Sequence, residues 1–117
     1  MSNKNYLKGY NFEKRVKKYL ESLGYYVLRQ GKSAFPDLIA IKKAEKDNCA
    51  VYAIECKVKR KYLSVDERNR LVKMWYNFNL SPYLAYREGK KLFFMGLINS
   101  HIYSAGKKGL NLESFGK

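Results

Sequence analysis

The sequence predicts an α/β (α+β) fold in which a mixed central sheet of about five strands is flanked by helices. Two segments show apolar residues at helical spacing, and short runs rich in β-branched and aromatic residues lie between and after them. The predicted order is α-β-β-β-α-β-β. A chain of 117 residues without repeats or low-complexity linkers suits one domain over residues 1–117.

The first helix is expected from Asn11, an acceptable N-cap, to a stop at Gly24. Its apolar face is formed by Phe12, Val16, Leu20 and Leu23. Glu13 lies at the edge of that face. Its spacing alone favours an exposed ion pair with Lys17, four residues on, although a helix packed on the sheet would also bring Glu13 to the strands.

Three strands are expected after this helix. They cover residues 25–30, 37–43 and 50–59. A loop that contains Pro36 separates the first two, and a polar turn separates the second from the third. Because that turn is short, the second and third strands are expected to be neighbours in the sheet.

The second helix begins at a capping-box pattern, with Ser64 as the N-cap and Glu67 three residues later. It is expected to continue to about Phe78. Two more strands then follow as a hairpin, over residues 83–88 and 91–98. The remaining residues, 99–117, allow either a short strand or a short helix.

The net charge is +14, from 24 Lys and Arg residues against 10 Asp and Glu residues. A field of this strength favours a polyanionic partner, with nucleic acid first and an anionic membrane surface second. No apolar run is long enough to span a bilayer, and the polar N-terminus does not resemble a secretory signal. We therefore expect an intracellular protein without a membrane span.

Histidine and cysteine usage excludes several chemistries. The single histidine, His101, cannot build a His-rich zinc site, has no nucleophile motif nearby and is interpreted as a surface or turn residue. Cys49 and Cys56 lack metal-ligand spacing, so we expect reduced and partly buried thiols.

Charged residues stand at the edges of the most apolar predicted strands. Asp37 opens the second strand, while Glu55 and Lys57 lie two residues apart in the third and share a face. If the two strands are neighbours, Asp37 and Glu55 lie close together and repel each other, which a cation would relieve. Oxygen ligands without histidine suit Mg²⁺ or Mn²⁺.

A lysine beside such a metal site can stabilise negative charge that develops on a phosphate or help to position an attacking water. Asp37, Glu55 and Lys57 thus indicate phosphodiester hydrolysis. The alternative is an ion pair between Glu55 and Lys57 on a solvated face of the sheet. The pattern alone leaves both interpretations open, and the apolar flanks and basic charge favour the first.

The residues Pro36-Asp37 followed by Glu55-Cys56-Lys57 resemble the PD-(D/E)XK nuclease superfamily. The stretches "FEKRVKKYLESLGYYVLRQGKSAFPDLIAI" and "AIECKVKRKYLS" are similar to the archaeal Holliday junction resolvases, including versions carried by archaeal viruses. This resemblance covers residues 8–87. It implies a restriction-endonuclease-like fold and a single nuclease domain over residues 1–117.

The resemblance also implies roles for individual residues. Asp37 and Glu55 correspond to metal-binding carboxylates, Lys57 to the catalytic lysine, and Glu13 to a helix glutamate near the metal, which reverses the interpretation from spacing. The implied metal is Mg²⁺, for which Mn²⁺ can substitute. The implied DNA contacts are Lys14 or Arg15, Arg29, Lys32, Ser33, Lys59, Arg60 and Lys61, which would hold phosphates without reading bases.

The implied assembly is a homodimer that holds one four-way junction across two active sites and nicks two strands symmetrically, in DNA recombination, replication or repair. Trp75 or Phe94 could contribute to the dimer patch, but each taken singly suits an ordinary core. Two alternatives stay open. One is a nuclease of the same fold that acts on flaps or on other branched or duplex DNA, and the other is a non-catalytic DNA-binding protein.

Overall fold

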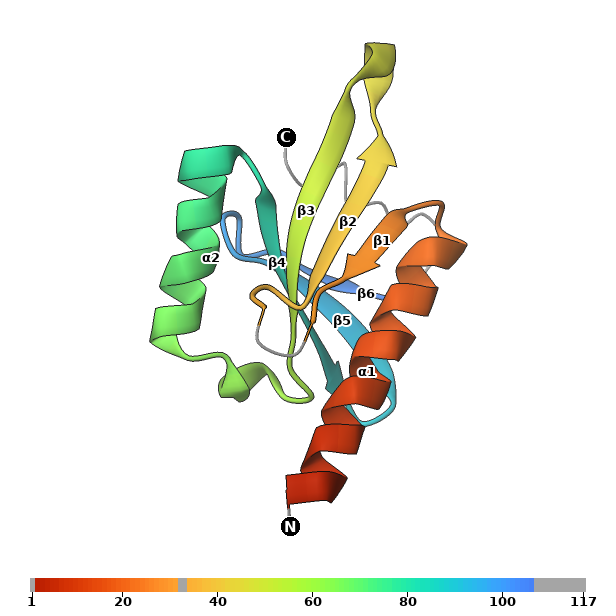
Figure 1. Cartoon of the computed structure of the whole chain (residues 1–117), viewed down its shortest axis with the longest axis vertical. Helices are drawn as coiled ribbons and strands as arrows, with labels where there is room; N and C mark the ends of the chain where they lie inside the picture. Colours follow the sequence, from red (N-terminus) through yellow and green to blue (C-terminus); the bar gives the residue numbers. More distant parts are fainter. Residues whose placement is uncertain (1, 32–33, 107–117) are drawn as a thin grey trace.

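A computed structural model describes residues 2–31 and 34–106 of the chain (Figure 1). The helices and strands in chain order are α1 (Ser2–Ser22), β1 (Tyr26–Arg29), β2 (Leu38–Lys43), β3 (Cys49–Cys56), α2 (Val65–Phe78), β4 (Ser81–Glu88), β5 (Lys91–Gly96) and β6 (Ile102–Ser104). Two short 3-10 turns, η1 (Glu45–Asp47) and η2 (Arg60–Tyr62), lie before β3 and before α2.

The strands form one mixed sheet in the order β1-β2-β3-β4-β5-β6. Neighbours pair antiparallel except β3 and β4, which are parallel because α2 crosses between them. The predicted mixed sheet and element order are confirmed. The sheet has six strands rather than about five. The additional strand is β6, which lies in residues 99–117, where the sequence allowed either a short strand or a short helix.

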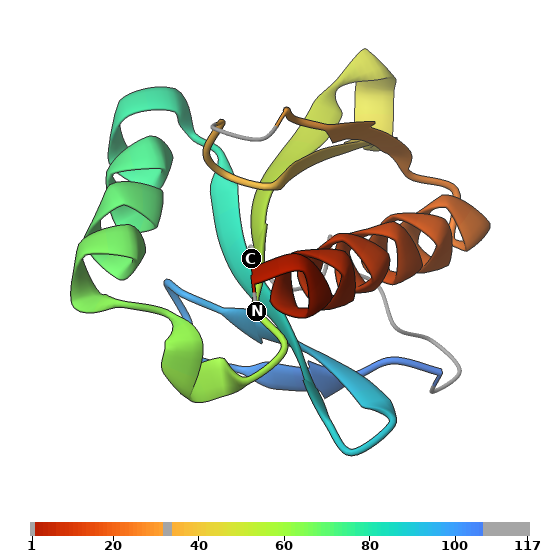
Figure 2. The same cartoon turned by 60° about the horizontal axis from the view of Figure 1, so that its bottom comes forward.

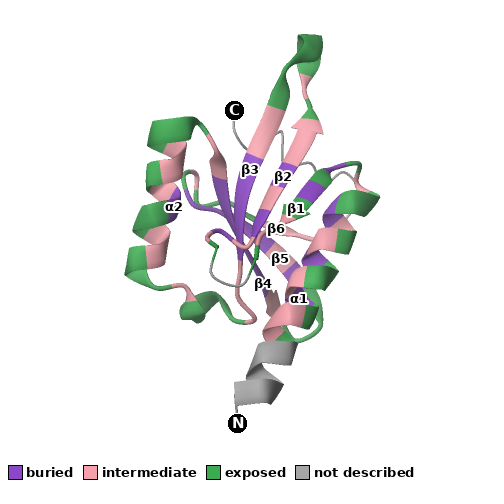
Figure 3. Cartoon of the chain, in the orientation of Figure 1, coloured by how far each residue is buried: buried purple, intermediate pink, exposed green. Residues whose placement is uncertain are grey.

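The sheet separates the two helices, with α1 on one face and α2 on the other (Figure 2). Side chains of the central strands alternate between two cores, as a pleated strand requires. In β4, Tyr83 and Ala85 pack toward α1, whereas Leu84 and Tyr86 pack on the α2 side. The middle of the sheet is therefore buried on both faces, while the tip of the β2–β3 hairpin is exposed (Figure 3).

Helix α1 begins earlier than expected. The predicted N-cap, Asn11, lies inside the helix, which already starts at Ser2. The segment before Asn11 contains no proline, and an established helix extends at little cost per residue. The helix therefore continues past Asn11 toward the N-terminus, although Asn11 is an acceptable N-cap. The predicted C-terminal stop is confirmed, because Gly24 adopts a φ of 94°.

Helix α2 follows its prediction closely. The Ser64 hydroxyl accepts a hydrogen bond from the Glu67 N–H, and the Glu67 carboxylate accepts one from the Ser64 N–H, each at 3.0 Å. The helix ends at Phe78, followed by Asn79 in the left-handed region. Strand β3 ends at Cys56, earlier than expected, although the Lys57 N–H still donates to the Ala85 carbonyl of β4.

Candidate active site

The start of β2 and the end of β3 bring two carboxylates together. Leu38 pairs with Ile54 across these antiparallel strands, and continuing the register by one residue places Asp37 opposite Glu55. The Asp37 N–H donates to Glu55 Oε1 at 3.1 Å, and the Cys56 N–H donates to Asp37 Oδ2 at 2.9 Å. The predicted juxtaposition is therefore present, and each carboxylate is held by the backbone of the opposite strand.

Glu55 is the most buried of the charged side chains at this site, with 4% of its surface exposed. Alternation along β3 directs it, with Ala53, toward the α2 side of the sheet. Lys57 Nζ lies 3.5 Å from Glu55 Oε2. The ion pair of the alternative interpretation is therefore present, but the solvated face on which it was expected is wrong, because Glu55 is buried.

Helix α2 contributes a residue that the sequence analysis missed at this site. Glu67 Oε2 accepts a hydrogen bond from Lys57 Nζ at 2.8 Å, which is shorter than the distance from Lys57 to Glu55. The capping-box pattern had identified Glu67 only as a helix-start residue. Its second role depends on how α2 packs on the sheet, and no local sequence signal indicates that.

Helix α1 brings Glu13 to the other side of the site. Its carboxylate accepts a hydrogen bond from Arg29 Nε at 3.1 Å, and the Arg29 guanidinium lies over the Tyr10 ring at 4.5 Å. Lys17 pairs instead with Glu21, at 2.9 Å. The ion pair that spacing favoured between Glu13 and Lys17 is therefore wrong.

Burial is the main reason why the pKa values of three carboxyl groups at this site, those of Glu55, Asp37 and Glu13, are raised. Burial, with the nearby Asp37 charge, raises the pKa of Glu55 to about 8. Burial also raises the pKa of Asp37, and burial together with the Asp37 charge raises that of Glu13. Glu13 and Asp37 thus lie close enough to repel each other across the site.

Lys57 and Glu67 are affected in the opposite direction. Burial lowers the pKa of Lys57, but the hydrogen bond to Glu67 and the Glu55 charge outweigh it, so the pKa is raised. Burial opposes ionisation of Glu67 as well, yet its bonds with Lys57 and Ser64 lower its pKa. These two groups therefore form a charged pair beside two carboxyl groups, Asp37 and Glu55, whose pKa values are raised.

The donor set fits a hard divalent cation. Asp37 and Glu55 supply carboxylate oxygens, and burial, the main cause of their raised pKa values, opposes negative charge that a bound cation would compensate. Among the side chains described, those of residues 8–31 and 34–106, no group of three histidine, cysteine or acidic residues lies close enough together to hold a metal. The Glu13 carboxylate is engaged by Arg29 instead, so its part in a metal site stays a prediction.

A cleft of about 430 Å³ opens beside Lys57. Lys8 and Gly9 of α1 line one side, and Val58 and Tyr62 line the other. The Lys59 ammonium lies over the Tyr62 ring at 5.8 Å, at the edge of this cleft. A basic, partly aromatic cleft next to the site suits a nucleic-acid strand.

The two candidates after Glu13 point to different places. Lys14 Nζ lies 5.4 Å from the centre of the Tyr10 ring, on which Arg29 also stacks. Arg15 donates to the Lys90 carbonyl at 2.6 Å, in the turn between β4 and β5. Lys14 therefore shares the Tyr10 ring with Arg29, the partner of Glu13. The predicted contacts Lys32 and Ser33 fall outside the described residues.

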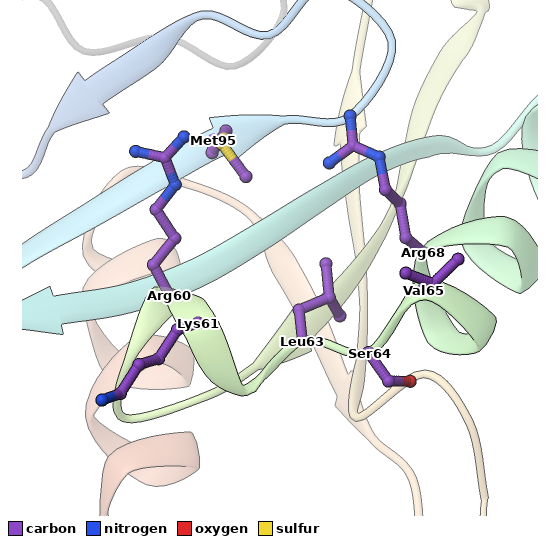
Figure 4. A pocket seen from close by; sticks show the side chains of 7 residues that line it. All are labelled: Arg60, Lys61, Leu63, Ser64, Val65, Arg68 and Met95. Atoms are coloured by element: carbon purple, nitrogen blue, oxygen red, sulfur yellow. The ribbon is translucent and has the colours of Figure 1, made fainter.

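A second pocket, of about 350 Å³, lies between η2, the start of α2 and β5 (Figure 4). It is lined by Arg60, Lys61, Leu63, Ser64, Val65, Arg68 and Met95. Arg60 and Arg68 extend to the same side, over Met95, whereas Lys61 points away from them. Arg60 also hydrogen bonds to the Tyr86 side chain. Arg68 is a basic residue here that the sequence analysis did not select.

The remaining predicted residues have ordinary structural roles. Phe94 is fully buried in the core on the α1 side, so it presents no surface for a dimer patch, while Trp75 is half-buried. His101 is exposed in the turn before β6, as expected. Cys49 and Cys56 are free, but Cys49 is exposed rather than partly buried. None of the described helices is long and apolar enough to cross a membrane.

A mixed sheet with an Asp at the start of one strand and a Glu-x-Lys at the end of its neighbour is the site architecture of PD-(D/E)XK-type nucleases, as the motifs indicated. The comparisons with known proteins agree. A profile of the archaeal Holliday junction resolvase (Hjc) family matches residues 4–114. The chain therefore belongs to the archaeal Holliday junction resolvase family.

Individual relatives resemble most of the chain. The crossover junction endodeoxyribonuclease Hjc of Methanocaldococcus jannaschii is 33% identical over 106 residues, which cover 88% of this chain and 74% of that protein. The solved structure of Archaeoglobus fulgidus Hjc, a Holliday junction resolvase from an archaeal hyperthermophile, aligns with a TM-score of 0.62 and 25% identity, over 78% of this chain and 74% of that one. The resemblance read from the sequence motifs is confirmed.

Proposed function

We propose that this chain is a metal-dependent endodeoxyribonuclease that resolves four-way DNA junctions by paired symmetric nicks. The observation that carries the proposal is the cluster at the ends of β2 and β3, where the Glu55 carboxylate accepts the Asp37 N–H and the Asp37 carboxylate accepts the Cys56 N–H, beside Lys57. Buried carboxylates with raised pKa values, in a chain of net charge +14, suit a cation and a polyanionic substrate.

The proposed cofactor is Mg²⁺, with Mn²⁺ as a substitute. Asp37 and Glu55 would hold the ion, and Glu13 would complete the set by leaving Arg29. When bound, such an ion polarises the scissile phosphate and lowers the pKa of a coordinated water. Compensation by the ion also explains why two carboxylates are kept together in a largely buried position.

The side chains around the cluster have distinct proposed roles. Lys57 stabilises the charge that develops on the phosphate, because its ammonium is held next to Glu55. Arg29, released from Glu13, is placed to contact a phosphate near the site. The residues proposed to contact the phosphate backbone of the DNA farther from the site are Lys14, Arg15, Lys32, Ser33, Lys59, Arg60, Lys61 and Arg68.

The proposed unit of action is a homodimer. Each chain supplies one carboxylate–lysine cluster among its described residues, whereas paired nicks in one junction need two. A two-fold dimer would present two equivalent sites to a substrate that is itself approximately symmetric. We further propose that residues 1–117 act as a single nuclease domain, inside an archaeal cell, whether a cellular or a viral genome encodes it.

The test compares the wild-type protein with Asp37→Asn on a labelled synthetic four-way junction and on linear duplex of the same sequence. Wild type is expected to cleave the junction with Mg²⁺ or Mn²⁺ and to leave the duplex intact. Asp37→Asn should lower the rate by more than about 100-fold, beyond the usual effect of residues that only support metal ligands. Asp47→Asn, an exposed change on the distant hairpin, is the matched control.

Pairing of the nicks is read on a supercoiled plasmid that extrudes a cruciform. Two coordinated nicks convert the plasmid directly to a linear product, whereas independent nicks accumulate an open circle first. Cleavage of flaps or linear duplex in preference to the junction would contradict the proposed substrate. Junction binding without cleavage in any divalent metal would contradict the proposed enzyme.

A further inference from the structure

We propose that Glu67 is a positioning residue for the catalytic lysine, which it holds from the first turn of α2. This inference rests on the proposed function, because it assigns Lys57 its catalytic role. Lys57 Nζ is 2.8 Å from Glu67 Oε2 and 3.5 Å from Glu55 Oε2. The ammonium is therefore held between the end of β3 and the start of α2.

The orientation of Glu67 is set independently of Lys57. Its Oε1 accepts the Ser64 N–H at 3.0 Å, and its own N–H donates to Ser64 Oγ at 3.0 Å. These two bonds close the capping box and leave Oε2 to accept from the lysine. One carboxylate thus starts a helix with one oxygen and directs an ammonium with the other.

This arrangement gives Lys57 a partner that the chemistry does not otherwise use. Glu55 is a proposed metal ligand, so its oxygens cannot serve the ammonium alone. Glu67 has no such second duty beyond the cap, and its side chain is 22% exposed, so water competes only partly for its charge. A flexible lysine stem held at its tip is already placed for the reaction, which is how supporting residues raise a rate.

The competing explanation is an ion pair that only stabilises the fold. Partly exposed pairs contribute little to stability, and the capping box is complete through Oε1 without Lys57. The two explanations differ for Glu67→Gln. A glutamine at this position can still close the capping box, but it lacks the negative charge that holds the ammonium. Cleavage rate and stability should therefore separate in this variant.

The experiment measures single-turnover cleavage of a preformed four-way junction in Mg²⁺, together with junction affinity and the thermal midpoint of the same variants. Glu67→Gln should cleave roughly 10- to 100-fold more slowly, as is typical when a supporting residue is lost, with affinity and midpoint near wild type. Glu67→Ala should show the same loss of rate and a lower midpoint, because the cap is lost as well.

Asp66→Asn is the matched control, since it removes the same charge from the neighbouring exposed residue in the same helical turn. It should cleave at the wild-type rate, which excludes a general effect of charge on DNA binding. The double variant Glu67→Gln with Lys57→Ala should cleave no more slowly than Lys57→Ala alone, because Glu67 acts only through the lysine.

Wild-type cleavage by Glu67→Gln would overturn the inference, as would equal slowing by Asp66→Asn. So would a further loss when Glu67→Gln is added to Lys57→Ala. These outcomes are distinct from failure of the proposed function. If the wild-type protein cleaves no junction, the nuclease proposal fails. If wild type cleaves and Lys57→Ala does not slow it, the nuclease proposal stands and the inference on Glu67 is overturned, because Glu67 is proposed to act only through the lysine.

Discussion

At the scale of single residues, Glu55 combines burial with an unfavourable charge. Its side chain is almost fully covered, it faces Asp37, and its pKa is raised to about 8. A protein retains such a group when the function compensates the cost, and here a cation at the proposed site would do so. The same carboxylate therefore links the stability of the metal-free protein to pH.

The folded protein binds more protons at Glu55 than the unfolded chain does between pH 4.5, the ordinary value, and about 8. The contribution of this proton to stability is thus fully present below the pKa of Glu55 in the unfolded chain. It is lost as pH rises toward the pKa of Glu55 in the folded protein. We expect the free energy of unfolding without metal to fall over this range, by less than about 1.4 kcal/mol per pH unit for one proton. Urea denaturation at several pH values measures it.

Glu55→Gln should flatten this pH dependence, because the amide carries no charge and its oxygen can still accept the Asp37 N–H. Glu45→Gln, an exposed change in η1, should leave it as in wild type. Added Mg²⁺ should stabilise wild type more at pH 8 than at pH 5. An identical pH dependence in wild type and Glu55→Gln would show that Glu55 does not titrate in this way.

At the scale of elements, α2 contributes to the site in addition to the strands. Its first turns carry Glu67 against Lys57 and Arg68 into the second pocket. Arg70 lies over the Phe35 ring at 4.2 Å and so contacts the loop before Asp37. The start of this helix must therefore be well defined if the groups at the ends of β2 and β3 are to keep their arrangement.

Ser64→Ala removes the side-chain acceptor for the Glu67 N–H and should destabilise the protein by about 1 kcal/mol. Equilibrium urea denaturation should show a lower midpoint with an unchanged slope. Asn79→Gly, at the other end of the same helix, replaces a residue with a φ of 61° and should preserve or raise stability. Equal stability of Ser64→Ala and wild type would mean that the cap contributes nothing measurable.

At the scale of the whole molecule, part of the charge of +14 lies around two hollows in the surface. Two basic hollows, the cleft beside Lys57 and the pocket with Arg60 and Arg68, are each lined in part by residues of η2. The hairpin tip of β2 and β3 points away from the core (Figure 1). A junction with several arms is suited to contacts on more than one side of a site, and phosphate contacts of this kind depend on salt.

Junction affinity should fall steeply with salt, and Arg68→Ala should weaken binding and reduce the slope of log Kd against log salt by about 1. Fluorescence anisotropy with an inactive Asp37→Asn background measures this without cleavage. Lys46→Ala, at the hairpin tip, should change neither the affinity nor the slope. If Arg68→Ala had the same affinity and the same salt slope as the Asp37→Asn background protein, as Lys46→Ala is expected to have, Arg68 would not contact the junction.

Features that depend on neighbouring residues were predicted from the sequence, whereas features that depend on distant residues were not. The capping box at Ser64 and the stop at Gly24 are local, and both are confirmed. The start of α1 was wrong, because Asn11 is compatible with a cap and equally with an exposed place within a helix. The six-stranded count was also missed, since the short β6 segment is stabilised only by pairing with β5.

The sequence by itself determined the class of fold and the proximity of Asp37 and Glu55, because strand alternation and the short turn between neighbouring strands are local features. It also determined the family, through the motifs around Asp37, Glu55 and Lys57. Only the tertiary structure decided that Glu13 pairs with Arg29 rather than Lys17, and that Glu67 holds Lys57. Both contacts join a helix to a strand or its end. Which helical side chain reaches the sheet depends on how the two surfaces pack, and packing is set by the whole core rather than by spacing along the chain.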